Sequence, residues 1–270
     1  MTNDDPKQVK VKKMSHTPRF VVACIGSGRL IGPPPSQFLR QQVAFSFGEY
    51  LRQAASRTGE WRQVPFCRSD IVDTNACCLI RPWDDNESSS FADGSSFAGI
   101  SDNLKLAMEY VGAKIEDLVI VGPGVNMVPG QFRSDNGPFL QHERGMPASK
   151  TLRYLNPTAR DLDFVWRFHI GIGAGAGSTK DARDGYGMRP MYSKDQLNVE
   201  DSVFPGLLDI VQKLMFGGRT VTAGHAHKMP TSLAGEKRFM RVPLDFDRQN
   251  YGGGKKASKY ANNLLSTLRK

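Results

Sequence analysis

The sequence has no long apolar run, no metal-type cysteine spacing and no common catalytic motif. No segment approaches the roughly 18 consecutive apolar residues of a membrane-spanning helix, so a membrane partner is not expected. The four cysteines show no C-x₂-C spacing, which argues against a zinc site and predicts buried, reduced thiols. A G-x-S-x-G nucleophile elbow and a P-loop are also absent. The sequence therefore points to no particular reaction.

The first residues also lack the apolar stretch of a secretory signal, and Asp4 and Asp5 are unlike a transit peptide. Together with the predicted reduced thiols, this indicates an intracellular location, cytoplasmic or nuclear, or a place in a virion. Secretion is not expected.

Positive charge is concentrated at the two ends of the chain. The formal net charge is +9, and residues 1–19 hold five basic groups against two acidic ones. Residues 236–270 hold nine basic groups against three acidic ones, whereas residues 20–235 are neutral, with 22 of each sign. A neutral body with two cationic ends is suited to binding a polyanion without making the fold depend on it. We therefore expect three parts: a basic N-terminal arm at 1–19, a folded body at 20–235 and a basic C-terminal segment at 236–270.

Aromatic residues and glycines lie among the charges of the C-terminal segment, where they can stack on unpaired bases and follow a backbone. The expected nucleic-acid-binding residues are Lys10, Lys12, Lys13, Arg19, Lys180, Lys237, Arg238, Arg241, Arg248, Tyr251, Lys255, Lys256, Lys259 and Tyr260. The first hypothesis is a non-enzymatic structural protein that binds single-stranded RNA through phosphates and base stacking. It would associate with copies of itself in a ribonucleoprotein, nucleocapsid or coat, with no cofactor.

A second use of the same charges is assembly with other proteins. The protein would then be an assembly protein whose basic tails contact other proteins instead of nucleic acid.

The hydrophobic pattern of the body alternates between strands and helices. Buried strands are expected at 19–25, 118–124 and 164–170, and amphipathic helices at 36–58, 101–111 and 201–217. Residues 84–99 read as a long exposed loop, and residues 122–150 as irregular. This order predicts an α+β or α/β fold, a single mixed-sheet domain with several amphipathic helices and extended basic termini.

A glycine run at 171–180 is the strongest candidate for contact with an anion. Its backbone N–H groups can converge on a phosphate, and the expected contacts are Gly173, Gly175, Gly177, Ser178 and Thr179. The alternative is a turn-forming loop with no ligand, because the run fits neither a P-loop nor a dinucleotide-binding fingerprint.

A His-Ala-His sequence supplies the one enzymatic alternative. His225 and His227 follow an expected strand, where side chains two residues apart share a face and can bind one divalent metal. With Tyr251 or Tyr260 downstream, the arrangement resembles single-strand nicking endonucleases. That resemblance implies metal-binding histidines and a tyrosine that attacks the phosphodiester. A divalent metal is expected only under this alternative, and otherwise the two histidines are structural.

Overall fold

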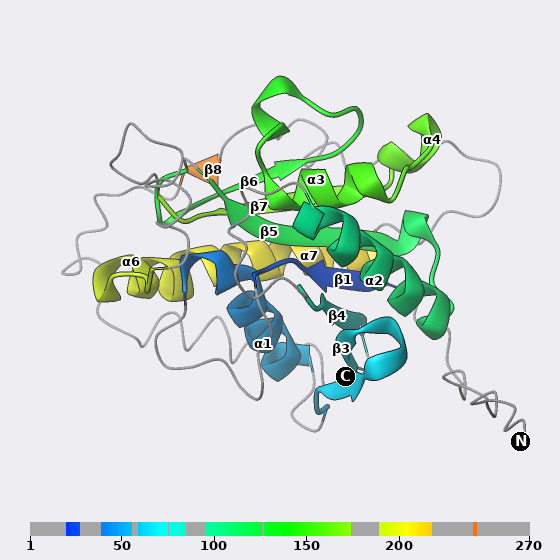
Figure 1. Cartoon of the computed structure of the whole chain (residues 1–270). Helices are drawn as coiled ribbons and strands as arrows, with labels where there is room; N and C mark the ends of the chain where they lie inside the picture. Colours follow the sequence, from blue (N-terminus) through cyan, green and yellow to red (C-terminus); the bar gives the residue numbers. More distant parts are fainter. Residues whose placement is uncertain are drawn as a thin grey trace, which may run out of the picture.

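The folded body is built on one mixed β-sheet (Figure 1). The structure is a computed structural model that describes residues 20–27, 39–55, 59–74, 76–84, 95–125, 127–173, 189–217 and 240–241. Its strands are β1 (Val21–Cys24), β2 (Arg62–Val64), β3 (Ser69–Asp73), β4 (Cys78–Pro82), β5 (Leu118–Gly124), β6 (Gln131–Asp135), β7 (Trp166–Gly171) and β8 (Met240–Arg241). Its main helices are α1 (Val43–Ala55), α2 (Ser95–Val111), α3 (Pro147–Tyr154), α4 (Ala159–Leu162), α6 (Ser193–Asn198) and α7 (Phe204–Gly217).

The strand order is β2-β3-β4-β1-β5-β7-β6-β8. Strands β4, β1, β5 and β7 are parallel, while β3 pairs antiparallel with β4, and β6 pairs antiparallel with β7. The chain leaves β1 toward β4 and then returns across the sheet to β5. The direction of winding therefore reverses between β1 and β5, as in a doubly wound α/β fold.

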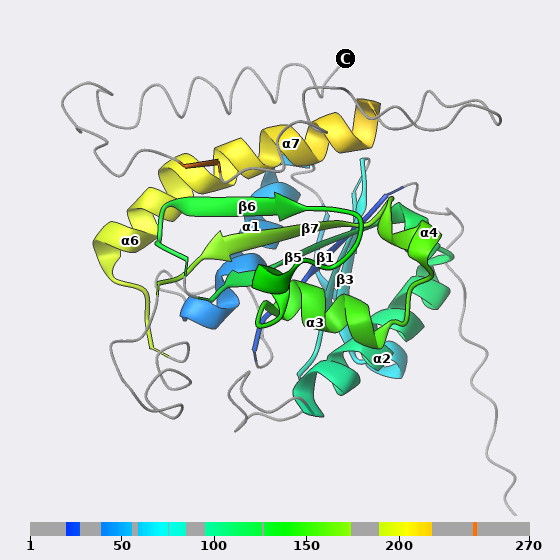
Figure 2. The same cartoon turned by 90° about the horizontal axis from the view of Figure 1, so that it is seen from above.

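The helices cover both faces of the sheet, which explains why the parallel strands are apolar on both sides. One core contains Val22, Cys24 and Val121 with residues of α1 and α7, and the other contains Val21, Ile120 and residues of α2 and α3. Figure 2 shows α7 on one side of the sheet and α2 and α3 on the other. The result is a three-layer arrangement.

Two short 3₁₀ segments lie just before helices of the body. Segment η1 (Arg40–Gln42) leads into α1, and η4 (Gln141–Glu143) precedes α3. Both segments carry fully buried charged side chains, Arg40 and Glu143.

The predicted fold class, a mixed-sheet α/β domain with amphipathic helices, is confirmed. Two local predictions were wrong. Residues 122–150 are not irregular, because β6 and α3 form there, and α2 begins at Ser95, inside the expected loop at 84–99. The cause is the same in both cases: serine, glycine and proline are frequent in these segments, but packing against the sheet outweighs their local preference.

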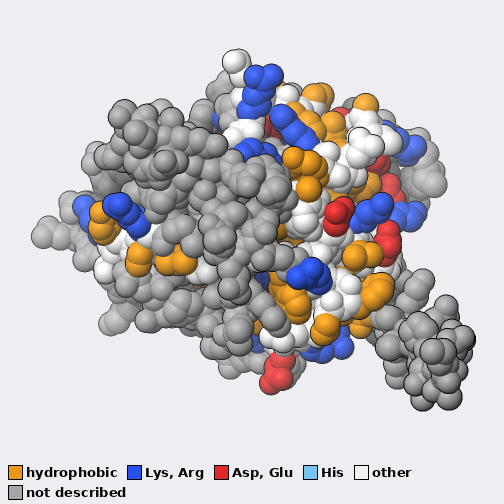
Figure 3. All heavy atoms as spheres, viewed as in Figure 1, with side chains coloured by type: hydrophobic (Ala, Val, Ile, Leu, Met, Phe, Trp, Pro, Cys, Tyr) orange, Lys and Arg blue, Asp and Glu red, His pale blue; other side chains and the backbone are white. Residues whose placement is uncertain are grey.

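The four cysteines are free and buried, as the sequence predicts. Within the described ranges, no helix is both long enough and apolar enough to cross a membrane. On the face shown in Figure 3, basic and acidic side chains are intermixed at the right of the described surface, and basic side chains lie at its top. The two basic ends lie outside the described residues apart from Arg241 in β8, so the division into arms and body stays a prediction.

Gly122 on β5 allows the start of α3 to approach the sheet closely. A Cβ atom there would meet the Ala148 backbone nitrogen at 3.1 Å and the Ala148 Cβ at 3.3 Å. We expect Gly122→Ala to lower the free energy of unfolding by about 1–3 kcal/mol, because the well-packed interface must separate.

Gly99 on α2 is the matched control. A Cβ there has nothing within 4 Å, so Gly99→Ala should stabilise the protein by about 0.5–1 kcal/mol through its helix propensity. Urea unfolding of both variants measures the contrast. Equal effects would show that α3 does not depend on the close approach at Gly122.

Candidate functional site

Strands β6 and β7 place four ionisable side chains on one face of the sheet. Arg133 lies opposite His169, and Asp135 lies opposite Arg167. Because side chains alternate between faces, Phe132, directly before Arg133, and Phe168, between Arg167 and His169, point into the core beneath α7 instead. The four polar residues are buried, with at most 7% of any of them exposed. They form the floor of a polar cluster covered by η4 and α3.

Glu143 is the centre of this cluster. Its Oε1 accepts from Arg167 Nε at 2.6 Å and from Ser149 Oγ at 2.8 Å, and its Oε2 accepts from Arg167 Nη2 at 3.1 Å. The Leu140 backbone amide donates to Oε2 at 2.7 Å. Burial alone would raise the pKa of Glu143, but nearby His169 and the bonds from Arg167 and Leu140 outweigh it and hold that pKa well below its usual range. Glu143 is therefore a buried carboxylate that remains charged.

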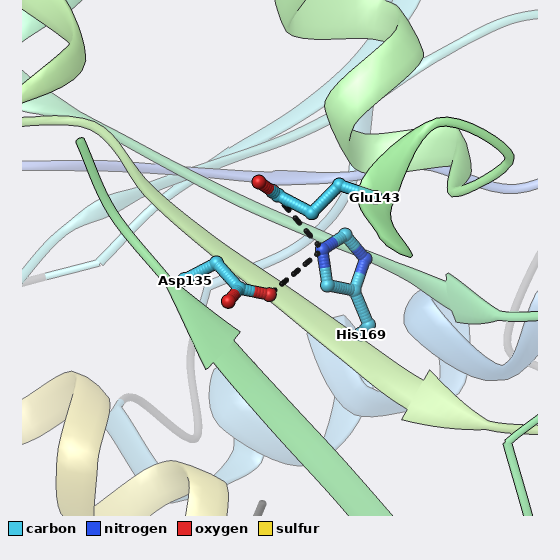
Figure 4. Close-up of side chains that lie close together, drawn as sticks. All are labelled: Asp135, Glu143 and His169. Carbon is cyan, nitrogen blue, oxygen red and sulfur yellow. Dashed lines mark ion pairs between the residues drawn. The ribbon is translucent and has the colours of Figure 1, made fainter. Parts of the chain in front are cut away.

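His169 lies between two carboxylates (Figure 4). Its Nε2 is 3.7 Å from Asp135 Oδ2, 3.8 Å from Glu143 Oε1 and 3.4 Å from Ser149 Oγ. Complete burial lowers the pKa of His169 from its ordinary 6.5, although both carboxylates act in the opposite direction. The imidazole is thus neutral at physiological pH.

By spacing alone, a metal ion could be held by the ligand atoms of Asp135, Glu143 and His169. The residues do not fit one. Arg167 is bidentate on Glu143, and Arg133 Nε lies 2.9 Å from Asp135 Oδ2, so two guanidinium groups already neutralise the two carboxylates. A divalent cation would add uncompensated charge to a buried site.

Ser149, His169 and Asp135 also have the residue types of a nucleophile–base–acid relay. All three side chains are buried, and Ser149 Oγ donates to Glu143 instead of standing free for attack. The cluster therefore does not present a free nucleophile to a substrate. Its charge balance indicates that it fixes η4 and α3 onto the sheet.

A second region of interest is the edge where the parallel strands end. In open α/β sheets, ligands bind beyond the carboxyl ends of the strands, at the point where winding reverses. Here that point lies between β1 and β5, where the Ile25 amide donates to Val121 O at 2.7 Å. The start of η1 and α1 lies at the same edge, because Gln42 Nε2 donates to the Ser27 carbonyl at 3.4 Å.

Arg40 joins three segments at this edge. Its Nη1 donates to the Ile172 carbonyl at 2.6 Å, just after β7, and its Nη2 lies 3.4 Å from Asp195 Oδ2 in α6. Its guanidinium also lies over the Tyr192 ring, 5.0 Å from the centroid. The neighbouring Gln41 is 5% exposed, and its Oε1 has no hydrogen-bond partner within the described part of the chain. A buried acceptor of this kind requires a donor from water, from a ligand or from a residue outside the described ranges.

The sequence-predicted site residues are mostly outside the described residues. Of the nucleic-acid-binding set, only Arg241 is described, in the two-residue strand β8, and the remaining members lie outside: Lys10, Lys12, Lys13, Arg19, Lys180, Lys237, Arg238, Arg248, Tyr251, Lys255, Lys256, Lys259 and Tyr260. Of the glycine-run set, Gly173 is described, and Gly175, Gly177, Ser178 and Thr179 lie outside. The same holds for His225 and His227. These site predictions therefore remain predictions.

Gly173 shows where the glycine run begins. It follows β7 at the carboxyl edge, with φ of +88°, and its amide donates to the Met127 carbonyl at 2.6 Å. This amide is already bonded, so any phosphate contact of the run must come from other residues.

Sequence reasoning missed the cluster around Glu143. One signal was present: the alternation Arg167-Phe168-His169-Ile170 places two polar residues on one face of a buried strand. A buried polar face requires polar partners, but Asp135 and Glu143 lay in the segment that was expected to be irregular.

Comparison with known proteins identifies the fold. No protein-family model and no curated protein matches the sequence. Among solved structures, a single-site mutant of peptidyl-tRNA hydrolase from Acinetobacter baumannii superposes with a TM-score of 0.54 at 17% identity, over 76% of this chain and 92% of that chain. The unsubstituted enzyme from the same organism and a peptidyl-tRNA hydrolase complex with n-propanol both give 0.53 at 18% identity, with the same coverage. The chain thus has a peptidyl-tRNA hydrolase-like fold.

This finding corrects the functional hypothesis drawn from the sequence. A non-enzymatic coat, nucleocapsid or other structural protein was expected, and the similar solved structures are instead hydrolases that cover most of the body. The hypothesis was wrong because it was based on the terminal charges. Such charges indicate a tendency to bind polyanions, but they carry no information on the fold of the body. The nicking-enzyme and protein-assembly alternatives are likewise not supported.

The ion pair in the cluster can be tested through stability. Glu143→Gln leaves the buried Arg167 without a counter-charge, so we expect the free energy of unfolding to fall by about 3–5 kcal/mol. Asp209→Asn, which breaks the exposed Lys213–Asp209 pair, should cost less than about 1 kcal/mol. Urea unfolding measures both, and a similar small loss in each would show that Glu143 does not anchor η4.

The neutral His169 predicts a dependence of stability on pH. Because the pKa of His169 is lowered by folding, the unfolded chain binds more protons below about pH 6.5, and the free energy of unfolding falls as the pH decreases. The stabilisation by Glu143 is lost at still lower pH, below its ordinary 4.5. In His169→Gln, the slope of the free energy of unfolding against pH, measured between pH 5 and 6.5, should be smaller by up to about 1.4 kcal/mol per pH unit. An unchanged slope would mean that folding does not lower the pKa of His169.

Proposed function

We propose that the chain is a hydrolase that binds RNA carrying an ester-linked acyl group and cleaves that ester. The observation that carries the proposal is the likeness in fold to solved peptidyl-tRNA hydrolases, which extends over 92% of their length. Neither the basic ends nor the glycine run is needed for the proposal, although both are compatible with an RNA partner.

The carboxyl edge between β1 and β5 is the proposed place of reaction. It is the switch point of the sheet, and it holds Gln41, with a buried acceptor that lacks a partner among the described residues. A carboxamide at this position can orient a water molecule through its oxygen and donate to a developing oxyanion through its nitrogen. Arg40 holds the start of α1 against the end of β7 and so fixes the position of Gln41.

The partner and location follow from the substrate class. The nucleic acid predicted from the sequence is proposed to be an acylated RNA of the tRNA type in place of an unstructured single strand. We retain an intracellular location as a prediction, since such RNAs are cytoplasmic or organellar. Association with further copies of the chain also stays a prediction.

The direct test is hydrolysis of N-acetyl-aminoacyl-tRNA by the purified full-length chain. We expect release of the acyl amino acid above the uncatalysed rate, and Gln41→Ala should lower kcat by about 10²-fold if the side chain contacts the reacting atoms. The matched control is Gln63→Ala, at an exposed position of β2 on the far edge of the sheet. It should retain the rate of the original protein. No release by the original protein would refute the hydrolase proposal, whether or not the RNA binds.

A further inference from the structure

A pocket of about 300 Å³ lies on the outer side of η4 and α3, above the buried cluster. It is lined by Phe139, Leu140, Gln141, Arg144 and Arg153. In Figure 3, basic and apolar side chains adjoin at the top of the molecule, over the loop that leads into α3. The lining includes no residue of the carboxyl edge of β1 and none of the buried side chains that form the cluster.

The charge in this pocket is positive and uncompensated. Arg144 and Arg153 are exposed, and within the described residues neither guanidinium forms an ion pair with a carboxylate. Of the described residues that line the pocket, none is acidic. Two unpaired guanidinium groups at one hollow create a local positive potential that favours an anion.

The Arg153 side chain and the backbone that carries Arg144 are supported from below. Arg153 lies over the Phe139 ring at 4.5 Å from its centroid, and the buried Arg167 lies over the same ring at 5.0 Å. Arg167 is in turn bonded to Glu143, the residue directly before Arg144. The buried ion pair therefore holds the ring and η4 in place, and this reduces the entropy lost when the arginines bind a ligand.

We propose that this pocket binds a backbone phosphate of the RNA partner. The inference rests on the proposed function for the identity of the polyanion, and on the pocket alone for the anion site. Guanidinium groups recognise phosphate through paired N–H donors, and Gln141 adds a further polar side chain. The exposed Arg153 guanidinium, supported by Phe139, is also a planar surface on which an unpaired base can stack. An acidic peptide would use the charges but not the planar surface.

The test uses the full-length chain and a labelled, deacylated tRNA, so that binding is measured without any reaction. The double variant Arg144→Gln/Arg153→Gln should bind about tenfold more weakly at low salt. The slope of log K against log salt should become shallower by about 0.7 to 0.9, the change expected for the loss of one phosphate contact. Inorganic phosphate, titrated alone, is the second probe. It should bind weakly to the original protein and not detectably to the variant.

The control removes two positive charges elsewhere. Lys114→Gln/Lys213→Gln changes exposed residues in surface ion pairs, one before β5 and one on α7, and should leave the salt slope unchanged. Thermal unfolding checks that the pocket variant is folded. An unchanged slope in the pocket variant, or an equal loss in the control, overturns the proposal, as does binding of inorganic phosphate with no effect on RNA.

The outcomes separate this inference from the hydrolase proposal. If RNA binding depends on Arg144 and Arg153 but no ester hydrolysis occurs, the phosphate-binding pocket is supported and the hydrolase proposal is refuted. If the protein hydrolyses the ester and the pocket variant binds RNA with unchanged affinity, the hydrolase proposal is supported and the phosphate-binding pocket is refuted.

Discussion

The buried ion pair between Glu143 and Arg167 is the constraint on which one face of this protein depends. Strand β7 contributes Arg167 to the interior, and a buried guanidinium requires a carboxylate close by. Glu143 comes from a segment with little apolar surface of its own, so polar bonds replace hydrophobic packing in fixing η4. The same residue accepts from Ser149, which attaches α3 to the network. One carboxylate thus positions a strand, a 3₁₀ segment and a helix.

The close packing of α3 has a second requirement, and the two act together. Gly122 on β5 pairs in register with His169 on β7, and its missing side chain makes room for Ala148. The helix is therefore near enough for Ser149 to reach Glu143. A larger residue at 122 would separate the polar groups of the cluster as well as the apolar ones. Polar and apolar packing are coupled through a single backbone position.

The sequence predicted the sheet better than it predicted either site. The strand Leu118–Gly124 is recognisable as a short, continuous apolar run, and the helix Phe204–Gly217 because its apolar residues recur with a helical period. The segment around Glu143 has no such period, since its structure depends on charged partners from β6 and β7 that are distant in sequence. Pairing of this kind becomes visible only when the register of the strands is known. The carboxyl edge was not predicted as a site, although the first residues of the glycine run, Gly171 and Gly173, lie there.

The charges of the body show why the distribution of net charge along the chain was a poor guide to function. Residues 20–235 carry 22 charges of each sign, which placed most of the expected polyanion contacts at the two ends. In the fold, carboxylates such as Glu143 and Asp135 are placed against arginines in the interior, and their charges are cancelled there. Arg144 and Arg153 remain on the surface without a carboxylate partner among the described residues, within a body of zero net charge. Local pairing, and not the sum along the chain, decides where an anion can bind.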